Sequence, residues 1–355
     1  MLPPMLITRQ SDPDNLEAPF GPLTERRSPP GGHYVRSHFP VPALDEGFTL
    51  RVTGEVGRPL TLGLAEVQAL GAETRTVTME CAGNGRVYLS PKVSGVQWAL
   101  GAVGTADWTG VPLRAVLELA GLRPGALEVV LTGADRGVMT EPVRSPGEAP
   151  YARSLPLDKA LEDVLLAYAM NGAPLTPAHG APLRAVVPGW YGMAAVKWLT
   201  GLHVTPTPYQ GYFQTVDYAR WETRADLPPE RVPLSAMQVK SQIAHPAPHA
   251  QVPAGQPGEI TGAAWTGEGT ITRVDVSTDG GQSWQAAAFL DPAEPGVWRR
   301  WTLPWTPRQP GPVTLLSRAT DSAGHTQPAA HDPRNGTYVV HHVLPVPVYV
   351  QEGAS

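Results

Sequence analysis

Residues 79–86 read MECAGNGR and contain the only cysteine of the chain, Cys81. The segment RTVTMEC (75–81) has the composition of a β-strand, and the Gly83-Asn84-Gly85 sequence that follows is a strong turn signal. The pattern predicts a strand that ends at the cysteine, followed by small residues that let a bound group approach the backbone. Arg86 would favour the thiolate, the form of cysteine that binds metals. A buried structural cysteine before a turn is the alternative interpretation.

A single cysteine limits the redox chemistry that this sequence can support. It excludes an intrachain disulfide, a cysteine-rich zinc site, a cysteine-ligated iron–sulfur cluster and the CxxCH haem attachment. Any redox reaction carried out by these 355 residues therefore uses one thiol or none.

Around the cysteine segment, residues 1–231 mix short strands with short helices and predict an α+β domain. Residues 1–45 are rich in proline and polar residues and indicate an extended arm. The predicted strands are FTLRVTGEV (48–56), RTVTMEC (75–81), GAPLRAVVPG (180–189) and AAVKWLTGLHVTP (194–206). The predicted helices are LTLGLAEVQAL (60–70), VPLRAVLELAGL (111–122) and LPLDKALED (155–163).

The pattern changes near residue 232, where helical spacing disappears. Short alternating strands follow, separated by turn signals at Asp279-Gly280-Gly281 and Asp321-Ser322-Ala323-Gly324. This pattern predicts a β-sandwich over residues 232–355. A chain of 355 residues is also longer than one core normally serves, so we expect two domains. The predicted strands include EITGAAW (259–265), TRVDVST (272–278), WRRWTLPW (298–305) and VTLLSRAT (313–320).

Composition excludes several classes of partner. The net charge of −5 predicts no basic surface for nucleic acid or for anionic membranes. No stretch approaches the roughly 18–20 apolar residues that a membrane span needs. The N-terminal sequence MLPPMLITRQSDPDNLEAPF shows no secretory signal, and we interpret Arg26-Arg27 as a surface pair, so we expect a cytoplasmic protein. A periplasmic location is the alternative if a precursor was trimmed.

CAGNGR resembles the cysteine motif of the sulfite oxidase family. Further blocks of that family occur in the same order along nearly the whole chain, including a V-P-G block and a V-K-W block. Each block alone is moderate evidence, and together they are specific. The matching segments are YVRSHFPVP (34–42), GVQWALGAVGTADWTGVPLRAVLELAG (95–121), LLAYAMNGAPLTPAHGAPLRAVVPGWYGMAAVKWL (165–199) and VKSQIAHP (239–246).

This resemblance implies a molybdopterin-binding α+β domain over residues 1–231 and an immunoglobulin-like β-sandwich dimerisation domain over residues 232–355. It implies a homodimer that carries molybdenum and molybdopterin. It further implies an enzyme that oxidises sulfite to sulfate by oxygen-atom transfer. The sequence shows no haem-binding domain, so electrons would pass to an external acceptor such as a c-type cytochrome.

The resemblance also assigns roles to individual residues. Matching positions imply that Cys81 is the protein ligand to molybdenum and that Tyr218, in QTVDY, is the active-site tyrosine. Guanidinium groups suit an oxyanion because they combine charge with paired, directional donors. The other residues implied at the substrate pocket are Arg36, Arg86, Trp98 and Arg299, with Arg300 as the alternative to Arg299. The residues implied to bind the cofactor, besides Cys81, are Arg36, His38, Asp135, His179, Arg184 and Lys197.

Two departures from the family pattern keep alternatives open. The usual C-A-G-N-R-R is CAGNGR here, so Gly85 removes one positive charge near the pocket. The usual G-A-R-H-V-K-W is GMAAVKW (192–198), which puts some cofactor contacts in doubt. The alternative enzymatic function is a molybdenum-dependent reductase of S-oxides or nitrate. A β-sandwich binding module with a decayed catalytic domain is the non-enzymatic alternative.

Overall fold

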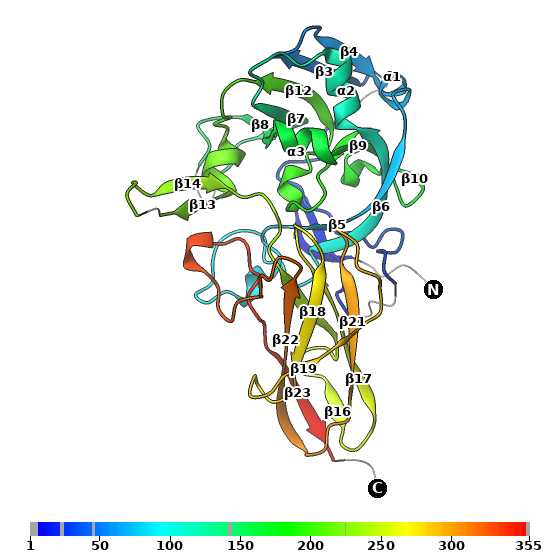
Figure 1. Ribbon diagram of the computed structural model, residues 1–355, viewed down its shortest axis with the longest axis vertical. Helices are drawn as coiled ribbons and strands as arrows, with labels where there is room; N and C mark the ends of the chain where they lie inside the picture. The colour runs from blue at the N-terminus through cyan, green and yellow to red at the C-terminus, as the bar shows by residue number, and fades with distance from the viewer. Residues whose placement is uncertain (1–5, 22–24, 45–46, 141–143, 224, 353–355) are drawn as a thin grey trace.

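The computed structural model describes residues 6–21, 25–44, 47–140, 144–223 and 225–352. Figure 1 shows two parts along the long axis of the molecule, with the C-terminus at the far end of the second. We call the described residues up to Pro233, the end of strand β14 (Glu230–Pro233), the N-terminal part, and those after it the C-terminal part. The predicted boundary at residue 232 falls inside β14.

Two five-stranded sheets form the framework of the N-terminal part. Strand β5 (Glu73–Glu80), which leads into Cys81, lies at the edge of the first sheet. All strand pairings in this sheet are antiparallel. The other strands of that sheet are β6 (Val103–Pro112), β9 (Leu165–Met170), β10 (Ala173–Pro174) and β11 (Arg184–Val186). The second sheet has the order β4-β3-β12-β7-β8, with β12 and β3 parallel. Its strands are β3 (Thr49–Gly54), β4 (Leu60–Gly63), β7 (Glu128–Gly137), β8 (Ala149–Pro156) and β12 (Leu199–Thr205).

The α-helices of the described residues are short. Helix α2 (Leu113–Ala120) buries one apolar face and ends at Gly121, whose φ of +70° suits glycine. Helix α1 (Leu64–Gln68) is shorter than the helix expected over 60–70, because Leu60–Gly63 pairs with β3 as strand β4. Helix α3 spans Leu157–Glu162. Strand residues outnumber helical ones, so helices contribute less than the sequence predicted. None of the helices described is long and apolar enough to cross a membrane.

The N-terminal arm is less extended than expected. It contains a hairpin of β1 (Ile7–Ser11) and β2 (Asp14–Glu17), and Leu16 and Val35 form a β-bridge. Residues 1–5, 22–24 and 45 of the predicted arm lie outside the described residues. The bridge joins the hairpin to the segment that leads into Arg36, and the N–H of Ala18 attaches the arm to the carbonyl of Gly101 at 3.0 Å.

The C-terminal part consists of two sheets that share one hydrophobic core. One sheet has the order β15-β17-β21-β20 and the other β16-β23-β22-β18-β19. Ile260 and Trp301 of the first sheet and Val274 and Leu315 of the second belong to the same buried cluster. The strands are β15 (Lys240–His245), β16 (Gln251–Pro253), β17 (Gly258–Trp265), β18 (Ile271–Ser277), β19 (Gln285–Ala286), β20 (Ala288–Phe289), β21 (Arg299–Trp305), β22 (Gly311–Asp321) and β23 (Val346–Gln351).

The two parts are joined by a continuous core. Trp265 and Trp298 of the C-terminal part lie in the largest buried cluster of the N-terminal part, and both rings contact Phe20 edge-on at 6.4 and 6.5 Å. Trp298 also bonds across the junction, because its indole N–H donates to the carbonyl of Arg26 at 2.6 Å and its backbone N–H to Oγ1 of Thr78 at 2.7 Å. Buried aromatic contacts of this kind fix the relative position of the parts. A site can therefore be built from both.

Candidate active site

Cys81 directly follows β5 and is buried, with 6% of its surface exposed. Its N–H donates to the carbonyl of Ala102 at 2.8 Å, and its own carbonyl accepts from the N–H of Asn84 at 2.9 Å, which closes the predicted turn. Gly85 adopts a φ of +94°, in the left-handed region that favours glycine. The strand and turn expected from MECAGNGR are thus confirmed.

Two cavities meet at the cysteine. The inner cavity, of about 630 Å³, extends from Cys81 into the N-terminal part. The outer cavity, of about 1240 Å³, extends from Cys81 past Arg86 and Trp98 to residues of the C-terminal part. Both cavities are lined by Arg36, His38, Cys81 and Tyr218. A group bound at the sulfur would therefore face both spaces.

The inner cavity collects buried positive charge. Nζ of Lys197 donates to Oγ of Ser37 and to the carbonyl of Ala178, both at 2.9 Å. Arg184, at the start of β11, donates to the carbonyls of His179 and Ala195 at 3.0 and 3.1 Å. Burial lowers the pKa of Arg184 to about 10, and burial together with Arg184 holds the pKa of Lys197 well below its usual range. These cations bond neutral oxygens, so an anion such as a phosphate would be stabilised here.

One carboxyl oxygen of the inner cavity lacks a hydrogen-bond partner among the described residues. Asp135 lies on β7, is 4% exposed, and its Oδ1 has no hydrogen-bond partner among the described residues. Burial raises the pKa of Asp135 to about 7, although Lys197 opposes the shift. A buried acceptor without a donor is costly, so Oδ1 is suited to an N–H donor from a bound molecule.

Histidines complete the wall of the inner cavity. His179 ends the 3-10 helix η2 (Pro177–His179), and its Nδ1 lies 2.8 Å from Oγ1 of Thr176. Burial and Arg184 lower the pKa of His179 to about 4. Sequence reasoning missed His33, whose pKa falls to about 3 because of burial and the neighbouring His179. Its position just before the YVRSH block was the available signal. Both rings are neutral at physiological pH and act through hydrogen bonds.

The outer cavity presents two guanidinium groups. Arg36 follows Val35 in the N-terminal arm and donates to Oδ1 of Asn15 at 3.2 Å and to the carbonyl of Ser37. Arg86 begins the 3-10 helix η1 (Arg86–Tyr88), and its Nη1 donates to the carbonyl of Val96 at 2.8 Å. Neither contact supplies a negative charge. The positive charge of both groups is therefore available to an anion in the cavity.

Gly83 and Trp98 shape the space around these groups. A Cβ at Gly83 would come within 2.5 Å of the Arg86 guanidinium, so a side chain at residue 83 would force that group to move. Trp98 lines the outer cavity but is fully buried, and its indole N–H has no partner among the described residues. The structure thus brings Arg36, Arg86 and Trp98 to the same cavity as Cys81.

A row of hydrogen-bonding side chains runs from Cys81 toward the C-terminal part. The phenol oxygen of Tyr218, which follows the π-helix η4 (Tyr212–Asp217), lies 2.8 Å from Nε2 of His38. That nitrogen is 3.9 Å from Oδ2 of Asp217, whose Oδ1 accepts from the hydroxyl of Tyr338 at 2.6 Å. Burial and the charges of Arg36 and Lys197 hold the pKa of His38 well below its usual range. The phenol of Tyr218 therefore shares a hydrogen bond with a neutral imidazole.

Tyr338 is the contribution of the C-terminal part to the outer cavity, and sequence reasoning missed it. It follows the 3-10 helix η5 (Pro333–Asn335) and lies against Arg86, with its ring centroid 5.1 Å from the guanidinium carbon. The carbonyl of Thr337 accepts from Nε of Arg86 at 3.1 Å. Nothing in the local sequence distinguishes Tyr338 from the other tyrosines of the chain.

The structure does not bring Arg299 to the site, which corrects the sequence expectation. Arg299, at the start of β21, donates to the carbonyls of Asp291 and Ile271 at 2.9 and 3.0 Å and stacks on Phe289. The alternative, Arg300, pairs with the Asp291 carboxylate at 2.9 Å. Neither residue lines the inner or the outer cavity. Carbonyls and a carboxylate of the C-terminal part satisfy both side chains in place.

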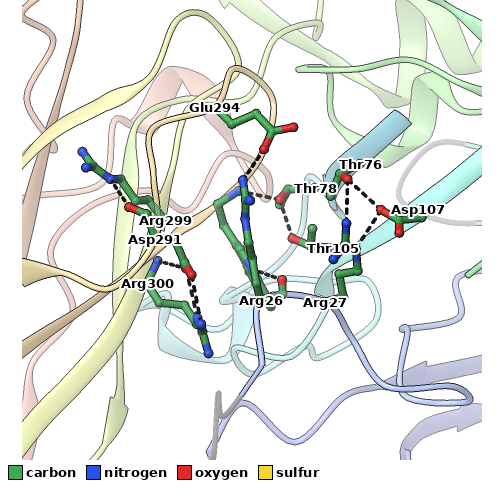
Figure 2. A network of polar contacts seen from close by, with 11 residues as sticks. Arg26, Arg27, Thr76, Thr78, Thr105, Asp107, Asp291, Glu294, Arg299 and Arg300 are labelled. Atoms are coloured by element: carbon green, nitrogen blue, oxygen red, sulfur yellow. Dashed lines mark hydrogen bonds and ion pairs between the residues drawn. The ribbon is translucent and has the colours of Figure 1, made fainter. Parts of the chain in front are cut away.

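Figure 2 shows these two arginines beside a polar junction between the parts. There Arg26 pairs with Glu294, and Nε of Arg27 lies 2.8 Å from Oδ1 of Asp107. The pair Arg26-Arg27, interpreted from the sequence as a surface pair, therefore has one half-buried member that links the two parts and one exposed member.

Family models match both parts of the chain. Residues 38–213 match the model described as "Oxidoreductase molybdopterin binding domain", and residues 231–341 match "Mo-co oxidoreductase dimerisation domain". The inner cavity fits such a group, because it offers buried cations to a phosphate, the Oδ1 of Asp135, without a partner among the described residues, to an N–H donor, and a thiol to a metal.

Individual relatives are similar over most of the chain. Sulfite oxidase of Gallus gallus is 37% identical over 92% of this chain and 73% of that protein. The mitochondrial sulfite oxidase of Drosophila melanogaster is 36% identical over 89% of this chain, which spans only 58% of that longer protein. Among solved structures, the sulfane dehydrogenase SoxCD of Paracoccus pantotrophus is 30% identical, with a TM-score of 0.80 over 94% of this chain and 83% of that one.

Proposed function

Because this chain belongs to the sulfite oxidase family of molybdopterin-dependent oxidoreductases, we propose that it oxidises sulfite to sulfate by oxygen-atom transfer, with Cys81 as the protein ligand to molybdenum. The observation that carries this proposal is the position of Cys81 at the junction of the two cavities. The inner cavity has the charges to hold a phosphorylated pterin, and the outer cavity has those to hold an oxyanion.

Several residues would hold the cofactor in the inner cavity. Lys197, Arg184 and His179 are placed to bind its phosphate, and Oδ1 of Asp135 is placed to accept from a pterin N–H. Arg36 and His38 line the wall between this group and the substrate. In the departure GMAAVKW, Ala195 stands where the family pattern has histidine and lines the inner cavity, so apolar contact replaces the polar contact expected at that position. When bound, the cofactor supplies a metal that transfers oxygen to sulfur and takes up two electrons.

In the outer cavity, Arg36 and Arg86 would bind and orient sulfite. Their charge and directional donors act in a cavity walled by buried side chains, where electrostatic interactions are stronger than in water. Trp98 would limit the size of the pocket, and Tyr218 would supply one phenolic hydrogen bond beside the sulfur ligand. Asp217 has a pKa that burial raises, so Oδ2 of this residue is the carboxylate oxygen best placed to take up a proton near His38.

The reaction must also dispose of protons and electrons. Sulfite and water give sulfate, two protons and two electrons. We propose that the electrons leave one at a time to an external acceptor such as a c-type cytochrome. The identity of that acceptor and the cytoplasmic location stay predictions.

The domain organisation belongs to the same proposal. Residues 1–231 would form an α+β catalytic domain, and residues 232–355 an immunoglobulin-like sandwich through which two chains pair. The two sheets with a common core and the match to a dimerisation domain support this division. Two-fold pairing is the commonest outcome for such modules.

Elemental analysis combined with an acceptor-reduction assay tests the function. Purified protein should contain about one molybdenum per chain, as a single-thiolate site requires, and should reduce an added one-electron acceptor only when sulfite is present. The alternative, a reductase of S-oxides or nitrate, is assayed with methionine sulfoxide or nitrate and a reduced dye. Turnover of those substrates without sulfite-dependent turnover would replace our assignment with the reductase.

A further inference from the structure

The loop that carries Cys81 is held by the C-terminal part. The N–H of Val339 donates to the carbonyl of Ala82 at 2.7 Å. Nζ of Lys240 donates to the carbonyl of Asn84 at 3.2 Å. With the bond from Arg86 to Thr337 at 3.1 Å, three of the five residues that follow Cys81 are bonded to the C-terminal part.

A buried ion pair stands behind this loop. Glu80 immediately precedes Cys81, and its Oε1 accepts from Nζ of Lys240 at 2.8 Å and from Nδ2 of Asn84 at 3.0 Å. Its Oε2 accepts from the indole N–H of Trp265 at 2.9 Å. Glu80 and Lys240 are each 1% exposed, and Trp265 is fully buried. All donors except Asn84 come from the C-terminal part, from β15 and β17.

The network reaches the backbone of the cysteine. Asn84, which Glu80 orients, accepts the N–H of Ala102 on its Oδ1 at 3.1 Å. Ala102 in turn accepts the N–H of Cys81 at 2.8 Å. A change at Lys240 or Trp265 would therefore be transmitted through Glu80 and Asn84 to the orientation of the sulfur.

Stability alone does not account for this arrangement. A buried ion pair is often no more stabilising than apolar residues of similar volume, because desolvation offsets the attraction between the charges. What the pair adds is direction, since every donor to Glu80 fixes the carboxylate at a set angle. Pre-organised ligands depend on such supporting hydrogen bonds.

We propose that Glu80, Lys240 and Trp265 are positioning residues through which the C-terminal part sets the orientation of Cys81. The C-terminal part is then a structural component of the active site as well as a surface for pairing. This inference rests on the proposed role of Cys81 as the metal ligand, but its first test needs no metal.

The first test is the reactivity of Cys81 in the cofactor-free protein. Because Cys81 is the only cysteine of the chain, its reaction with a disulfide reagent such as DTNB reports on this loop alone. The Lys240→Met variant keeps an unbranched side chain one atom shorter but removes the ammonium group, and Trp265→Phe removes one donor. We expect the rate of reaction to rise at least about tenfold in both variants, the factor that corresponds to about 1.4 kcal/mol.

A matched control separates this effect from general loosening of the junction. Glu294→Gln breaks a second ion pair between the parts, with Arg26, away from the cysteine loop. Its rate should stay within about twofold of the wild type. Low urea concentrations should leave the raised rates nearly unchanged, because local opening exposes little surface. A rate that rises steeply with urea would mean global unfolding and would overturn the proposal.

The second test examines the loaded enzyme. In Lys240→Met and Trp265→Phe, we expect the electron paramagnetic resonance spectrum of the one-electron-reduced metal to change. We also expect kcat to fall by a larger factor than KM changes. Lys240→Arg should restore part of both. A positioning role would be refuted if both variants had the spectrum and the thiol reactivity of the wild type.

If Lys240→Met fails to fold, Trp265→Phe, which keeps an aromatic ring in the core, decides the question. If the variants show raised thiol reactivity but the wild-type protein binds no molybdenum when the cofactor is supplied, the loop contacts are upheld and the proposed function is rejected.

Discussion

The phenol oxygen of Tyr218 lies 2.8 Å from Nε2 of His38, although 180 residues separate them. The contact joins the N-terminal arm to the segment that leads into the C-terminal part, and both residues line both cavities beside Cys81. Burial and nearby cations hold the pKa of His38 well below its usual range, so the hydrogen bond joins the phenol to a neutral imidazole. The hydroxyl thus has a fixed direction at the place where the proposed substrate and cofactor meet.

Replacing Tyr218 with phenylalanine should lower kcat by roughly ten- to hundredfold, since the hydrogen bond that its hydroxyl would donate to the sulfite anion contributes about 1.5–3 kcal/mol. KM for sulfite should change less, because the charges of Arg36 and Arg86 remain. Steady-state kinetics with a one-electron acceptor measures both constants. Tyr349→Phe, at an exposed position of strand β23, is the control and should behave as the wild type. An unchanged kcat in Tyr218→Phe would remove this residue from the reaction.

Replacing Cys81 with serine should abolish sulfite turnover while leaving a folded protein. A hydroxyl is a harder and far less acidic ligand than a thiol, so it does not replace the thiolate at molybdenum. Circular dichroism and light scattering check the fold, and elemental analysis checks the metal. Full activity in the serine variant would show that the ligand assignment is wrong.

Replacing Arg36 with glutamine should raise KM for sulfite by roughly ten- to hundredfold, because one charged donor to the anion is lost. Sulfate should also become a weaker competitive inhibitor. Arg299→Gln is the matched control, since Arg299 bonds carbonyls of the C-terminal part and lines neither cavity. A larger effect on KM at Arg299 than at Arg36 would restore the sequence expectation that the structure corrects.

The stability of the cofactor-free protein should fall as pH rises from about 4 to about 7, because of Asp135. Burial raises the pKa of this carboxyl from 3.8 to about 7 in the folded protein. Well below pH 3.8 both states are protonated, whereas between pH 3.8 and about 7 the unfolded state has released a proton that the folded state still holds. The difference is on the order of 4 kcal/mol.

Thermal melts of wild type and Asp135→Asn between pH 4 and 7.5 check this expectation. The asparagine variant should lose most of the dependence on pH in this window. Loading with cofactor should weaken the dependence in the wild type, because an N–H donor at Oδ1 stabilises the carboxylate. Identical pH profiles for the two cofactor-free proteins would contradict the assignment.

Pairing of two chains through residues 232–355 predicts a dimer at micromolar concentration. Size-exclusion chromatography with light scattering measures the mass, for which one chain contributes 37.8 kDa. A mass of one chain at all concentrations tested would refute the pairing.

Local sequence was sufficient where backbone chemistry decides the structure. The end of a strand at Cys81 and the turn at Gly83-Asn84-Gly85 follow from strand composition and from glycine's access to positive φ, and the structure shows both. The helix that stops at Gly121 follows for the same reason. Expectations for residues 60–70 failed in part, because pairing with β3 outweighed a weak helical preference.

The tertiary structure alone decided which distant residues surround the cysteine. Arg36 and Cys81 were expected at one site through their family motifs, but no motif indicated that Tyr338 would face Arg86 or that Arg299 would turn away. Nor did the sequence indicate that Glu80 would bond Lys240 across 160 residues. Such contacts depend on how two hydrophobic cores dock, and docking is set by the summed packing of Trp265, Trp298 and their neighbours rather than by the preference of any short segment.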